Sequence, residues 1–304
     1  MSKELASLIN ELRTRLPGMT ILEREPLSEH CSFRIGGKCA ALLQPSSEEE
    51  LVGAAELLRR RGEKPLVIGN GTNLLITDEP LRRIVIQLGS AFSRCTVEGD
   101  CEIRAEAGVS LYKLANFAAG AALAGLEFAQ GIPGTLGGGV SMNAGAYGGE
   151  MKDVVASVRY LDGELRLRET DEPDLSYRHS RFSDTDDVIL SALLRLHPGN
   201  EEEIRAAMRT LMEKRRASQP LDMPSAGSTF KRPVGGYAAA LIDQAGLKGF
   251  RVGGAQVSEK HAGFVVNAGN ASFDDVLRLM DEVRARVLAS SGIELEPEVK
   301  IIRN

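Results

Sequence analysis

One arginine stands in a short polar segment where it could bind a carboxylate. The segment is Tyr177-Arg178-His179-Ser180, just ahead of the apolar run DVILSALLRL. A guanidinium stays charged at any working pH and can hold a carboxylate through two parallel hydrogen bonds. The alternative is an exposed arginine that pairs with a nearby acid such as Asp174.

A serine in a loop of small residues is a second candidate. Ser228 lies in the segment SAGSTFK, residues 225–231, within a stretch that holds five cations and one carboxylate. The cations are Lys214, Arg215, Arg216, Lys231 and Arg232. This positive charge suits an anionic substrate. No histidine stands in a nucleophile motif, so Ser228 is better suited to donate a proton than to attack; the alternative is ordinary turn chemistry.

Two glutamates precede the last apolar run of the chain, in Glu296-Pro297-Glu298 before residues 299–302. A carboxyl group buried in a terminal strand has a raised pKa and could serve as a catalytic acid. Alternate spacing equally allows a residue that faces solvent.

The segment from Gly131 to Gly149, GIPGTLGGGVSMNAGAYGG, is rich in glycine. Each glycine inside a helix or strand costs about 0.5–1 kcal/mol, so this density fits a backbone that bends sharply or touches a ligand. The alternative, a flexible loop, is disfavoured by apolar residues spaced through the segment as packing anchors. These anchors are Ile132, Leu136, Val140 and Met142.

A second loop, Gly69-Asn70-Gly71-Thr72-Asn73, separates two short apolar runs. Its backbone N–H groups and polar side chains could seat a diphosphate. The alternative is a β-hairpin, because Asn-Gly is the strongest type I′ turn signal. The loop is no dinucleotide fingerprint, since Leu74 stands where the third glycine would be, and the chain has no P-loop.

Composition excludes several classes of protein. The 304 residues are 43% hydrophobic and 26% charged, which is the balance of a globular protein rather than a disordered one. A net charge of −5 argues against a dedicated nucleic-acid binder. The longest apolar run, residues 114–126, is too short for a membrane helix, and no signal peptide is visible, so we expect a cytoplasmic protein. The four cysteines and four histidines lack metal-site spacing, and no metal is expected.

The elements that must position these residues form three parts. Leu5, Leu8, Ile9, Leu12 and Leu16 predict an amphipathic helix. Residues 40–68 predict a strand, a helix that Ser47 and Glu50 cap as a capping box, and a second strand. Short β-like runs around one helix at 111–124 predict an α+β middle part. After a helix at 201–216, the C-terminal part is predicted to contain helices near 237–244 and 272–289 and strands at 263–266 and 294–302.

Seven segments together resemble, in order, the signatures of the UDP-N-acetylenolpyruvoylglucosamine reductase family. They are SFRIGG, VIGNGTNLLI, GIPGTLGGGVSMNAGAYG, YRHS, SAGSTFK, VSEKHAGFVVN and LEPEVKII, and they run from about residue 26 to residue 302. The resemblance implies an α+β fold with a two-part FAD-binding unit, like that of vanillyl-alcohol oxidase, and a C-terminal α+β substrate-binding domain. The expected boundaries are 1–80, 81–218 and 219–304. The short spacing around YRHS looks like the compact subclass, which lacks an inserted capping segment.

The resemblance also implies the ligands. FAD would lie against both glycine-containing loops, and NADPH would be the hydride donor. The residues expected to bind FAD are Gly69, Asn70, Gly71, Thr72, Asn73, Gly131, Pro133, Gly134, Thr135, Gly138, Ser141, Asn143, Ala144 and Gly145. Cys31 departs from the family, which often has a threonine there.

The family pattern implies a catalytic set of Arg178, Ser228 and Glu298. Lys231, Arg216 and Tyr177 would bind the substrate, an enolpyruvyl UDP-sugar that is reduced for peptidoglycan synthesis, and hence for cell-wall biogenesis, cell shape and division. No nucleic acid, membrane or oligomer is expected, and a monomer is the default. Two alternatives remain at this stage: a flavin oxidase of the same cofactor fold, and a non-catalytic flavin-binding regulatory protein.

Overall fold

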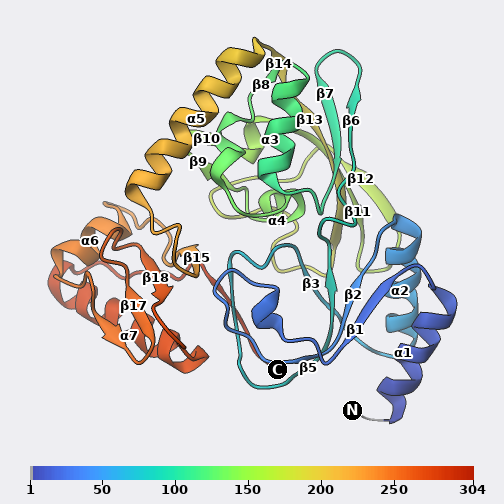
Figure 1. The fold of residues 1–304 in the computed structure, drawn as a ribbon, viewed down its shortest axis with the longest axis horizontal. Helices are drawn as coiled ribbons and strands as arrows, with labels where there is room; N and C mark the ends of the chain where they lie inside the picture. Colours follow the sequence, from blue (N-terminus) through green and yellow to red (C-terminus); the bar gives the residue numbers. More distant parts are fainter. Residues whose placement is uncertain (1–2) are drawn as a thin grey trace. The chain divides into compact units, whose positions relative to one another are not determined.

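The computed structural model describes residues 3–304, which form two compact units, each with its own hydrophobic core (Figure 1). Unit 1 consists of the described residues up to Arg24, of Ala40–Asn70 and of Arg83–Lys214. Unit 2 consists of Glu25–Cys39, Gly71–Arg82 and Arg215–Asn304. Both units are discontinuous in sequence, and the three-part division after residues 80 and 218 stays a prediction.

The first part of unit 1 contains a four-stranded sheet in the order β1-β2-β5-β3. Its elements are α1 (Lys3–Arg15), β1 (Thr20–Glu23), β2 (Cys39–Gln44), α2 (Glu48–Arg60), β3 (Leu66–Ile68) and β5 (Leu81–Gln87). The predicted amphipathic helix is confirmed as α1, which buries Leu8, Ile9 and Leu12. The predicted strand, helix and strand are β2, α2 and β3, although β5 lies between the two strands in the sheet.

The cap of α2 differs from the prediction in one bond. The side chain of Ser47 accepts the N–H of Glu50, as in a capping box. The carboxylate of Glu50 instead accepts the N–H of Ser46 at 2.7 Å and its hydroxyl at 2.9 Å. The helix start is therefore correct, and the returning bond reaches one residue further back.

The second part of unit 1 is built on an antiparallel five-stranded sheet in the order β12-β11-β13-β7-β6. Its strands are β6 (Cys95–Glu98), β7 (Glu102–Glu106), β11 (Val155–Leu161), β12 (Leu167–Thr170) and β13 (Val188–Arg195). Its helices are α3 (Leu111–Gly120), η2 (Glu127–Gly131), α4 (Leu136–Ser141), η3 (Met151–Asp153) and α5 (Glu201–Ser218). Two short strand pairs complete it: β8 (Leu123–Ala124) with β14 (His197–Pro198), and β9 (Gly145–Ala146) with β10 (Gly149–Glu150).

Helix α3 ends four residues before the predicted Ala124. Ala122 has a φ of 54°, a left-handed conformation that a helix cannot include. Leu123 and Ala124 then pair with Pro198 and His197 as strands. The apolar Ala-rich run hid this change because its composition does not distinguish a helix from a short buried strand.

Unit 2 is an α+β unit with an antiparallel four-stranded sheet in the order β15-β18-β17-β16. Its elements are η1 (Leu27–Glu29), β4 (Leu74–Ile76), β15 (Ser225–Ser228), α6 (Ala238–Gln244), β16 (Arg251–Val252), β17 (Ala255–Val257), β18 (Phe264–Asn267), α7 (Phe273–Ser291) and β19 (Lys300–Ile302). Helix α7 begins with a complete capping box of Ser272 and Asp275. The predicted last strand at 294–302 is shorter than expected, and β19 pairs in parallel with β4.

The strands with which β3 and β4 pair decide between the two interpretations of the loop Gly69–Asn73. Strand β3 pairs in parallel with β5, whereas β4 pairs with β19. The two strands that flank the loop belong to different sheets, so the hairpin interpretation is wrong. The loop connects strands of two different sheets, and contacts with other segments of the chain set its backbone conformation.

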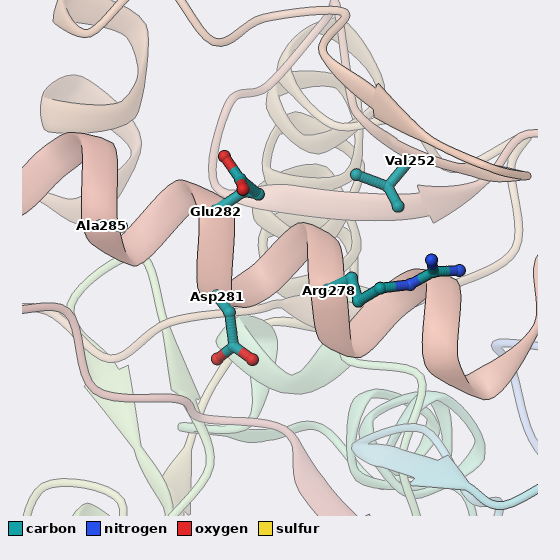
Figure 2. Close-up of a pocket in the computed structure, with 5 residues that line it drawn as sticks. All are labelled: Val252, Arg278, Asp281, Glu282 and Ala285. Carbon is teal, nitrogen blue, oxygen red and sulfur yellow. The ribbon is translucent and has the colours of Figure 1, made fainter.

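A pocket of about 410 Å³ lies beside α7 in unit 2 (Figure 2). It is lined by Val252, Arg278, Asp281, Glu282 and Ala285. Its three charged side chains all form ion pairs: Arg278 with Asp275 at 2.9 Å, Asp281 with Arg284 at 3.6 Å and Glu282 with Arg286 at 3.2 Å. None of the predicted site residues lines it.

Among residues 3–304, no helix is both long and apolar enough to cross a bilayer. The same part of the chain contains no group of three or more His, Cys, Asp or Glu side chains that could hold a metal ion. The four cysteines are free thiols, and burial raises the pKa of Cys39 and of Cys95 to about 11.

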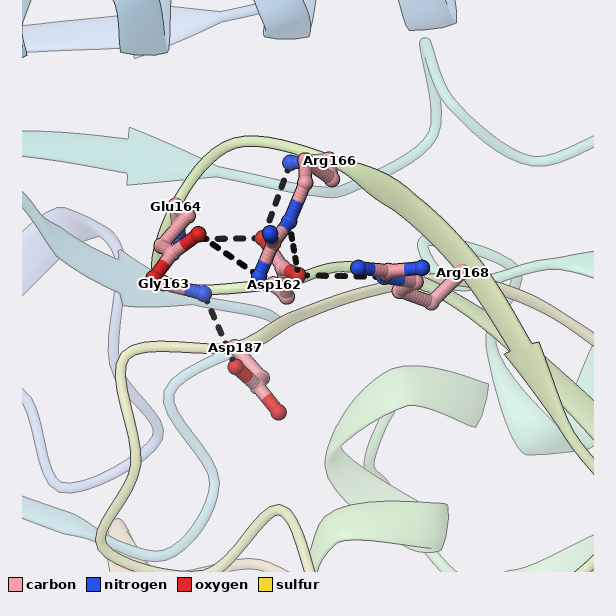
Figure 3. A network of polar contacts seen from close by, with 6 residues as sticks. All are labelled: Asp162, Gly163, Glu164, Arg166, Arg168 and Asp187. Atoms are coloured by element: carbon pink, nitrogen blue, oxygen red, sulfur yellow. Dashed lines mark hydrogen bonds and ion pairs between the residues drawn. The ribbon is translucent and has the colours of Figure 1, made fainter.

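A carboxylate closes the hairpin between β11 and β12 (Figure 3). Asp162 accepts the backbone N–H groups of Glu164 and Arg166, both at 2.9 Å. It also accepts side-chain Nε–H groups of Arg166 at 3.0 Å and of Arg168 at 3.2 Å. The backbone bond from Arg166, followed by these guanidinium groups, holds the pKa of Asp162 well below its usual range. These bonds therefore favour the ionised form of the carboxylate, in which it stabilises the turn.

We predict that Asp162→Asn lowers the urea midpoint of unfolding at pH 7, because an amide cannot replace all four accepted bonds. A depressed folded-state pKa contributes stability that is complete above the unfolded pKa of about 3.9 and is lost as pH falls toward the folded pKa. The difference between variant and wild type should therefore narrow below about pH 4. The control is Asp187→Asn, where the carboxylate accepts a single bond, from Gly163 N–H, that the amide oxygen can still accept; an equal effect of both variants at pH 7 would contradict the assignment.

Candidate active site

The predicted site residues lie in both units, with the unit boundary between Asn70 and Gly71. In unit 1, Gly69 lies against the glycine-rich segment. A Cβ on Gly69 would lie 2.2 Å from Oγ1 of Thr135. Asn70 Nδ2 donates to the carbonyl of Pro133 at 3.4 Å, and Gln87 Nε2 donates to the carbonyl of Gly69 at 3.2 Å. The two loops therefore touch with no space for a side chain between them.

The glycine-rich segment contains a helix, α4, that its composition argues against. Glycine is required in it by packing: a Cβ on Gly137 would lie 2.9 Å from Cβ of Ala107. The opposite is true of Gly138, which is exposed and whose Cβ would meet only Oγ1 of Thr135, at 3.7 Å. Packing within the protein therefore does not require a glycine at position 138. The glycine leaves the main chain of the segment accessible on its exposed side.

This geometry fits the cofactor that the sequence implies. Asn70, Pro133 and Gly138 are exposed, and they lie around the close contact of Gly69 with Thr135. Exposed glycine backbone beside polar side chains suits a large anionic ligand that must approach the main chain closely. The residues of unit 1 therefore fit the diphosphate part of FAD.

Other predicted FAD-binding residues of this segment bond within the protein. Asn143 is fully buried, has a φ of 44°, and donates from Nδ2 to Glu150 Oε2 at 2.6 Å and to the carbonyl of Ser176 at 3.1 Å. Its Oδ1 accepts the N–H of Lys152 at 2.9 Å. The side chain of Asn143 is thus committed to holding three parts of unit 1 together, and its backbone N–H donates to the carbonyl of Val140 at 3.2 Å.

The remaining residues of the set have mixed surroundings. The carbonyl of Ser141 accepts the hydroxyls of Ser180 at 2.7 Å and Ser183 at 3.0 Å. The N–H of Ala144 donates to Gly139 at 2.7 Å, and Gly145 pairs with Glu150 in the β9–β10 hairpin. Gly131 ends η2, and both it and Gly134 are half-buried. Roles for these residues toward FAD stay predictions.

Arg178 occupies a tight turn next to Asn143. Ser176 and His179 exchange backbone hydrogen bonds of 3.0 and 3.1 Å, so Tyr177 and Arg178 are the two central residues of the turn. The φ of Arg178 is 56°, which is typical of the third position of a type II turn. The guanidinium lies 5.0 Å from the centre of the Tyr177 ring. The fully buried Ser180 anchors the end of this turn to α4.

A carboxylate that sequence reasoning missed accompanies Arg178. Glu150 forms an ion pair with Lys152 at 2.5 Å and accepts a hydrogen bond from Asn143. Hydrogen bonding by Lys152, then by Asn143, and the charges of Lys152 and Arg178 hold the pKa of Glu150 below its ordinary value. No local pattern marks Glu150, because its contacts depend on the β9–β10 hairpin.

In unit 2, Gly71 and Asn73 hold the second half of the predicted FAD loop. Gly71 has a φ of 61°, and a Cβ there would lie 2.4 Å from the carbonyl oxygen of His30. Asn73 Nδ2 donates to the carbonyl of Glu298 at 3.0 Å, and its own carbonyl accepts the N–H of Lys300 at 2.9 Å. Thr72, between them, is half-buried. The thiol of Cys31 faces inward and donates to the carbonyl of Ile35 at 3.2 Å.

The same unit brings Ser228 and Glu298 to neighbouring positions. The N–H of Glu298 donates to the carbonyl of Thr229 at 2.8 Å, and the N–H of Lys231 donates to the carbonyl of Glu296 at 2.8 Å. Residues 229–231 and 296–298 therefore run side by side, and Ser228 immediately precedes this pairing. Both Ser228 and Glu298 are half-buried.

The structure separates the two glutamates of the Glu-Pro-Glu segment. The side chain of Glu296 is 69% exposed and forms an ion pair of 2.5 Å with Lys231. Glu298 is half-buried. The surroundings therefore favour Glu298 as the acid that works in a site. Arg216 is exposed on α5, and its carbonyl accepts Nζ of Lys260 at 2.5 Å.

Two family models match this chain. A model of the FAD binding domain matches residues 39–171, and a model of the C-terminal domain of UDP-N-acetylenolpyruvoylglucosamine reductase matches residues 219–302. With the α+β fold and the glycine-lined surface of unit 1, these matches define an FAD-dependent oxidoreductase.

Relatives cover nearly the whole chain. The UDP-N-acetylenolpyruvoylglucosamine reductases of Caldanaerobacter subterraneus subsp. tengcongensis and Syntrophomonas wolfei subsp. wolfei are each 46% identical over 97% of this chain, covering 98% and 99% of those proteins. The crystal structure of the reductase (MurB) from Thermus caldophilus aligns with a TM-score of 0.80 and 35% identity, covering 94% of this chain and 100% of that one. The chain belongs to the UDP-N-acetylenolpyruvoylglucosamine reductase family. The predicted family and fold class are therefore confirmed, and neither the oxidase nor the regulatory alternative is supported.

We predict that Gly69→Ala lowers FAD affinity at least about fivefold, because overpacking of about 1–3 kcal/mol must push the Gly69 loop away from Thr135. Thr135→Ala in the same chain removes the closest atom and should restore part of the affinity. The measurement is fluorescence titration of the apoprotein with FAD. Gly138→Ala is the matched variant: its Cβ meets no protein atom closer than 3.7 Å, so a loss of FAD affinity there without loss of stability reports contact with the cofactor itself. Unchanged affinity in both single variants would contradict the site.

We predict that Asn143→Asp lowers kcat/KM for the sugar nucleotide about tenfold, because losing the donors to Ser176 and Glu150 loosens the Arg178 turn. Aspartate keeps the acceptor for Lys152 and tolerates positive φ. Steady-state kinetics per bound flavin is the measurement. The control is Asn116→Asp, which loses two Nδ2 bonds on α3, to Tyr112 and Gln130. If Asn143→Asp loses FAD while kcat/KM per flavin is unchanged, its role is toward the cofactor.

Proposed function

We propose that this chain catalyses the NADPH-dependent reduction of the enolpyruvyl group of UDP-N-acetylglucosamine-enolpyruvate to give UDP-N-acetylmuramate. When bound, FAD supplies the transfer of hydride from NADPH to the vinyl carbon of the substrate. The observation that carries the proposal is the pairing of residues 229–231 with 296–298, which brings a hydroxyl and a carboxyl group expected for one reaction to neighbouring positions.

Arg178 is assigned to the substrate carboxylate. Hydride addition to the vinyl carbon places negative charge on that carboxylate, and preorganised positive charge lowers the energy of such a transition state. The backbone of the turn that carries Arg178 is fixed by Asn143 and Ser180, which supports a guanidinium that is positioned before the reaction. Glu298 is assigned as an acid in the same reaction.

Ser228 is assigned as the proton donor to the carbon next to the carboxylate, which gives the lactyl product. Its Oγ–H bond breaks as the new C–H bond forms, and solvent restores the proton. Support comes from its position: Gly227 has a φ of 76°, and the register of β15 with β18 shifts between Ser225 and Ser228. The hydroxyl of Thr229 closes this bulge by accepting the N–H of Val265 at 2.9 Å.

Lys231, Arg216 and Tyr177 are assigned to the rest of the substrate. Lys231 can exchange Glu296 for a phosphate at small cost, since exposed ion pairs contribute about 0–1 kcal/mol. Tyr177 is 52% exposed and can offer its ring and hydroxyl to the sugar nucleotide. We assign Gly69–Asn73, Gly131, Pro133–Thr135, Gly138, Ser141 and Asn143–Gly145 to FAD, with the side chain of Asn143 acting as a support.

The finer setting is also a proposal. NADPH and sugar nucleotides are cytoplasmic metabolites, so the enzyme would work in the cytoplasm, as a monomer, in peptidoglycan precursor synthesis. Cell-wall biogenesis, cell shape and cell division would depend on it through that product. The chain would form part of the compact subclass without a capping insertion.

An anaerobic assay tests the reaction directly. The purified protein should show a bound flavin spectrum, and NADPH consumption should depend on the enolpyruvyl sugar nucleotide. Absence of flavin would overturn the cofactor assignment. Flavin reduction by NADPH with no reoxidation by the sugar nucleotide would overturn the assignment of the substrate.

We predict that Ser228→Ala keeps flavin reduction by NADPH but slows reoxidation by the substrate by at least about 100-fold, the range expected for loss of a general acid. Stopped-flow absorbance separates the two half-reactions. Ser225→Ala, on the same strand, is the control and should stay within about twofold, as expected of a substitution away from the transferred proton. Equal losses in both half-reactions of Ser228→Ala would show that the proton-donor role is wrong.

A further inference from the structure

A histidine ring in unit 2 is hydrogen-bonded into the turn that precedes β18. Nδ1 of His261 accepts the N–H of Gly263 at 3.2 Å. The carbonyl of Gly263 in turn accepts the N–H of Thr229 at 2.8 Å. A single residue, Gly263, therefore connects the imidazole to the residue that follows Ser228.

Packing fixes the ring against the same strand. The rings of His261 and Phe264 meet edge to face, with centroids 5.0 Å apart and an angle of 79°. Phe264 is the residue of β18 that pairs with Ser228. A Cβ on Gly263 would lie 3.0 Å from Cε1 of His261, so the ring closely fills the space beside that glycine. The histidine thus contacts Phe264, which pairs with Ser228, and Gly263, which bonds to Thr229.

The turn that carries His261 is itself closed by hydrogen bonds of its backbone and of Ser258. Ser258 Oγ accepts the N–H groups of Lys260 and His261, both at 3.2 Å. The N–H of Ser258 donates to the carbonyl of Phe264 at 2.9 Å, and the N–H of Phe264 donates to the carbonyl of His261 at 3.0 Å. The imidazole is therefore part of a rigid turn.

The bond from Gly263 requires a neutral ring. Nδ1 accepts, so the single proton of the neutral imidazole is on Nε2, and protonation would replace an acceptor by a donor that faces another donor. Burial, with a smaller effect of the positive charge of Lys248, lowers the pKa of His261 below its ordinary value. The charges around it are Lys248, which pairs with Asp243 at 2.7 Å, and Glu259 and Lys260 of the turn. The neutral state is favoured at pH 7.

We infer that His261 is a positioning residue for Ser228: as a neutral acceptor it holds Gly263, and through Gly263 it holds the backbone at Thr229 that aims the Ser228 hydroxyl. This role rests on the proposed function of Ser228. His261 neither donates nor removes a proton in the reaction. It acts through two successive hydrogen bonds.

Two substitutions separate the acceptor from the ring. His261→Phe keeps an aromatic ring but has no acceptor, whereas His261→Asn offers Oδ1 near the position of Nδ1 and does not titrate. The half-reactions of both variants are measured as for Ser228→Ala, on holoenzyme with matched flavin content. We expect His261→Phe to slow reoxidation by the substrate about tenfold with little change in reduction by NADPH, and His261→Asn to recover most of that loss.

Two further measurements do not depend on turnover. Nitrogen NMR of the wild-type imidazole should show a proton on Nε2 and none on Nδ1 at pH 7. Amide exchange at Thr229 and Gly263 should be faster in His261→Phe than in the wild type.

The pH dependence of the reoxidation rate is a separate, kinetic test. The rate of the wild type should be retained at neutral pH and should fall as pH drops through the pKa of His261. This part of the acid decline should be missing in His261→Asn.

The outcomes distinguish this inference from the function on which it rests. If Ser228→Ala leaves reoxidation intact, the proposed role of Ser228 fails. If Ser228→Ala is impaired but His261→Phe is not, or if His261→Phe slows both half-reactions equally, the positioning role of His261 fails and that of Ser228 remains.

Discussion

Buried backbone groups must find hydrogen-bond partners, and this constraint shapes the candidate site more than any other. The residues with predicted roles stand largely on loops and short turns, where no regular ladder pairs the N–H and C=O groups. Polar side chains supply the missing partners. Asn143 bonds to Ser176 and Lys152, Ser180 bonds to Ser141, and Thr229 bonds to Val265. These three side chains are almost completely buried. Their removal would expose the loops to rearrangement because each leaves a main-chain group unsatisfied.

Elements with a strong local signal could be predicted from the sequence. Helices α1 and α7 have apolar residues at helical spacing, and Ser272 with Asp275 marks the start of α7. The motifs also identified the family, because seven segments in one order are far more specific than any single loop. Elements that depend on distant partners were missed or misjudged. Helix α4 forms in spite of three consecutive glycines, since Gly137 packs against Ala107 of another segment.

The residues of the candidate site also divide into those that the sequence marks and those that depend on distant partners. Ser228, Arg178 and Glu298 are predicted because their residue types suit the chemistry and stand in family motifs. Glu150 and His261 were not assigned roles, since nothing in their neighbourhood in the sequence shows that one lies near Arg178 and the other holds the turn beside Thr229. The structure distinguishes Glu296 from Glu298 by their surroundings. The side chain of Glu296 is exposed to solvent and pairs with Lys231, whereas the N–H of Glu298 donates to the carbonyl of Thr229.

The exposure of Ser228 follows from the bulge in β15. Side chains alternate between the two faces of a strand, so a regular strand that buries Ala226 would bury residue 228 as well and expose residue 229. The structure shows the reverse: Ala226 and Thr229 are 5% and 3% exposed, while Ser228 is half-buried. The register shift between Ser225 and Ser228 and the positive φ of Gly227 insert the extra residue that changes the face. The hydroxyl that we assign as the proton donor thereby stands on a strand whose flanking residues, Ala226 and Thr229, are buried, so the packing of these neighbours holds the backbone of Ser228 in place.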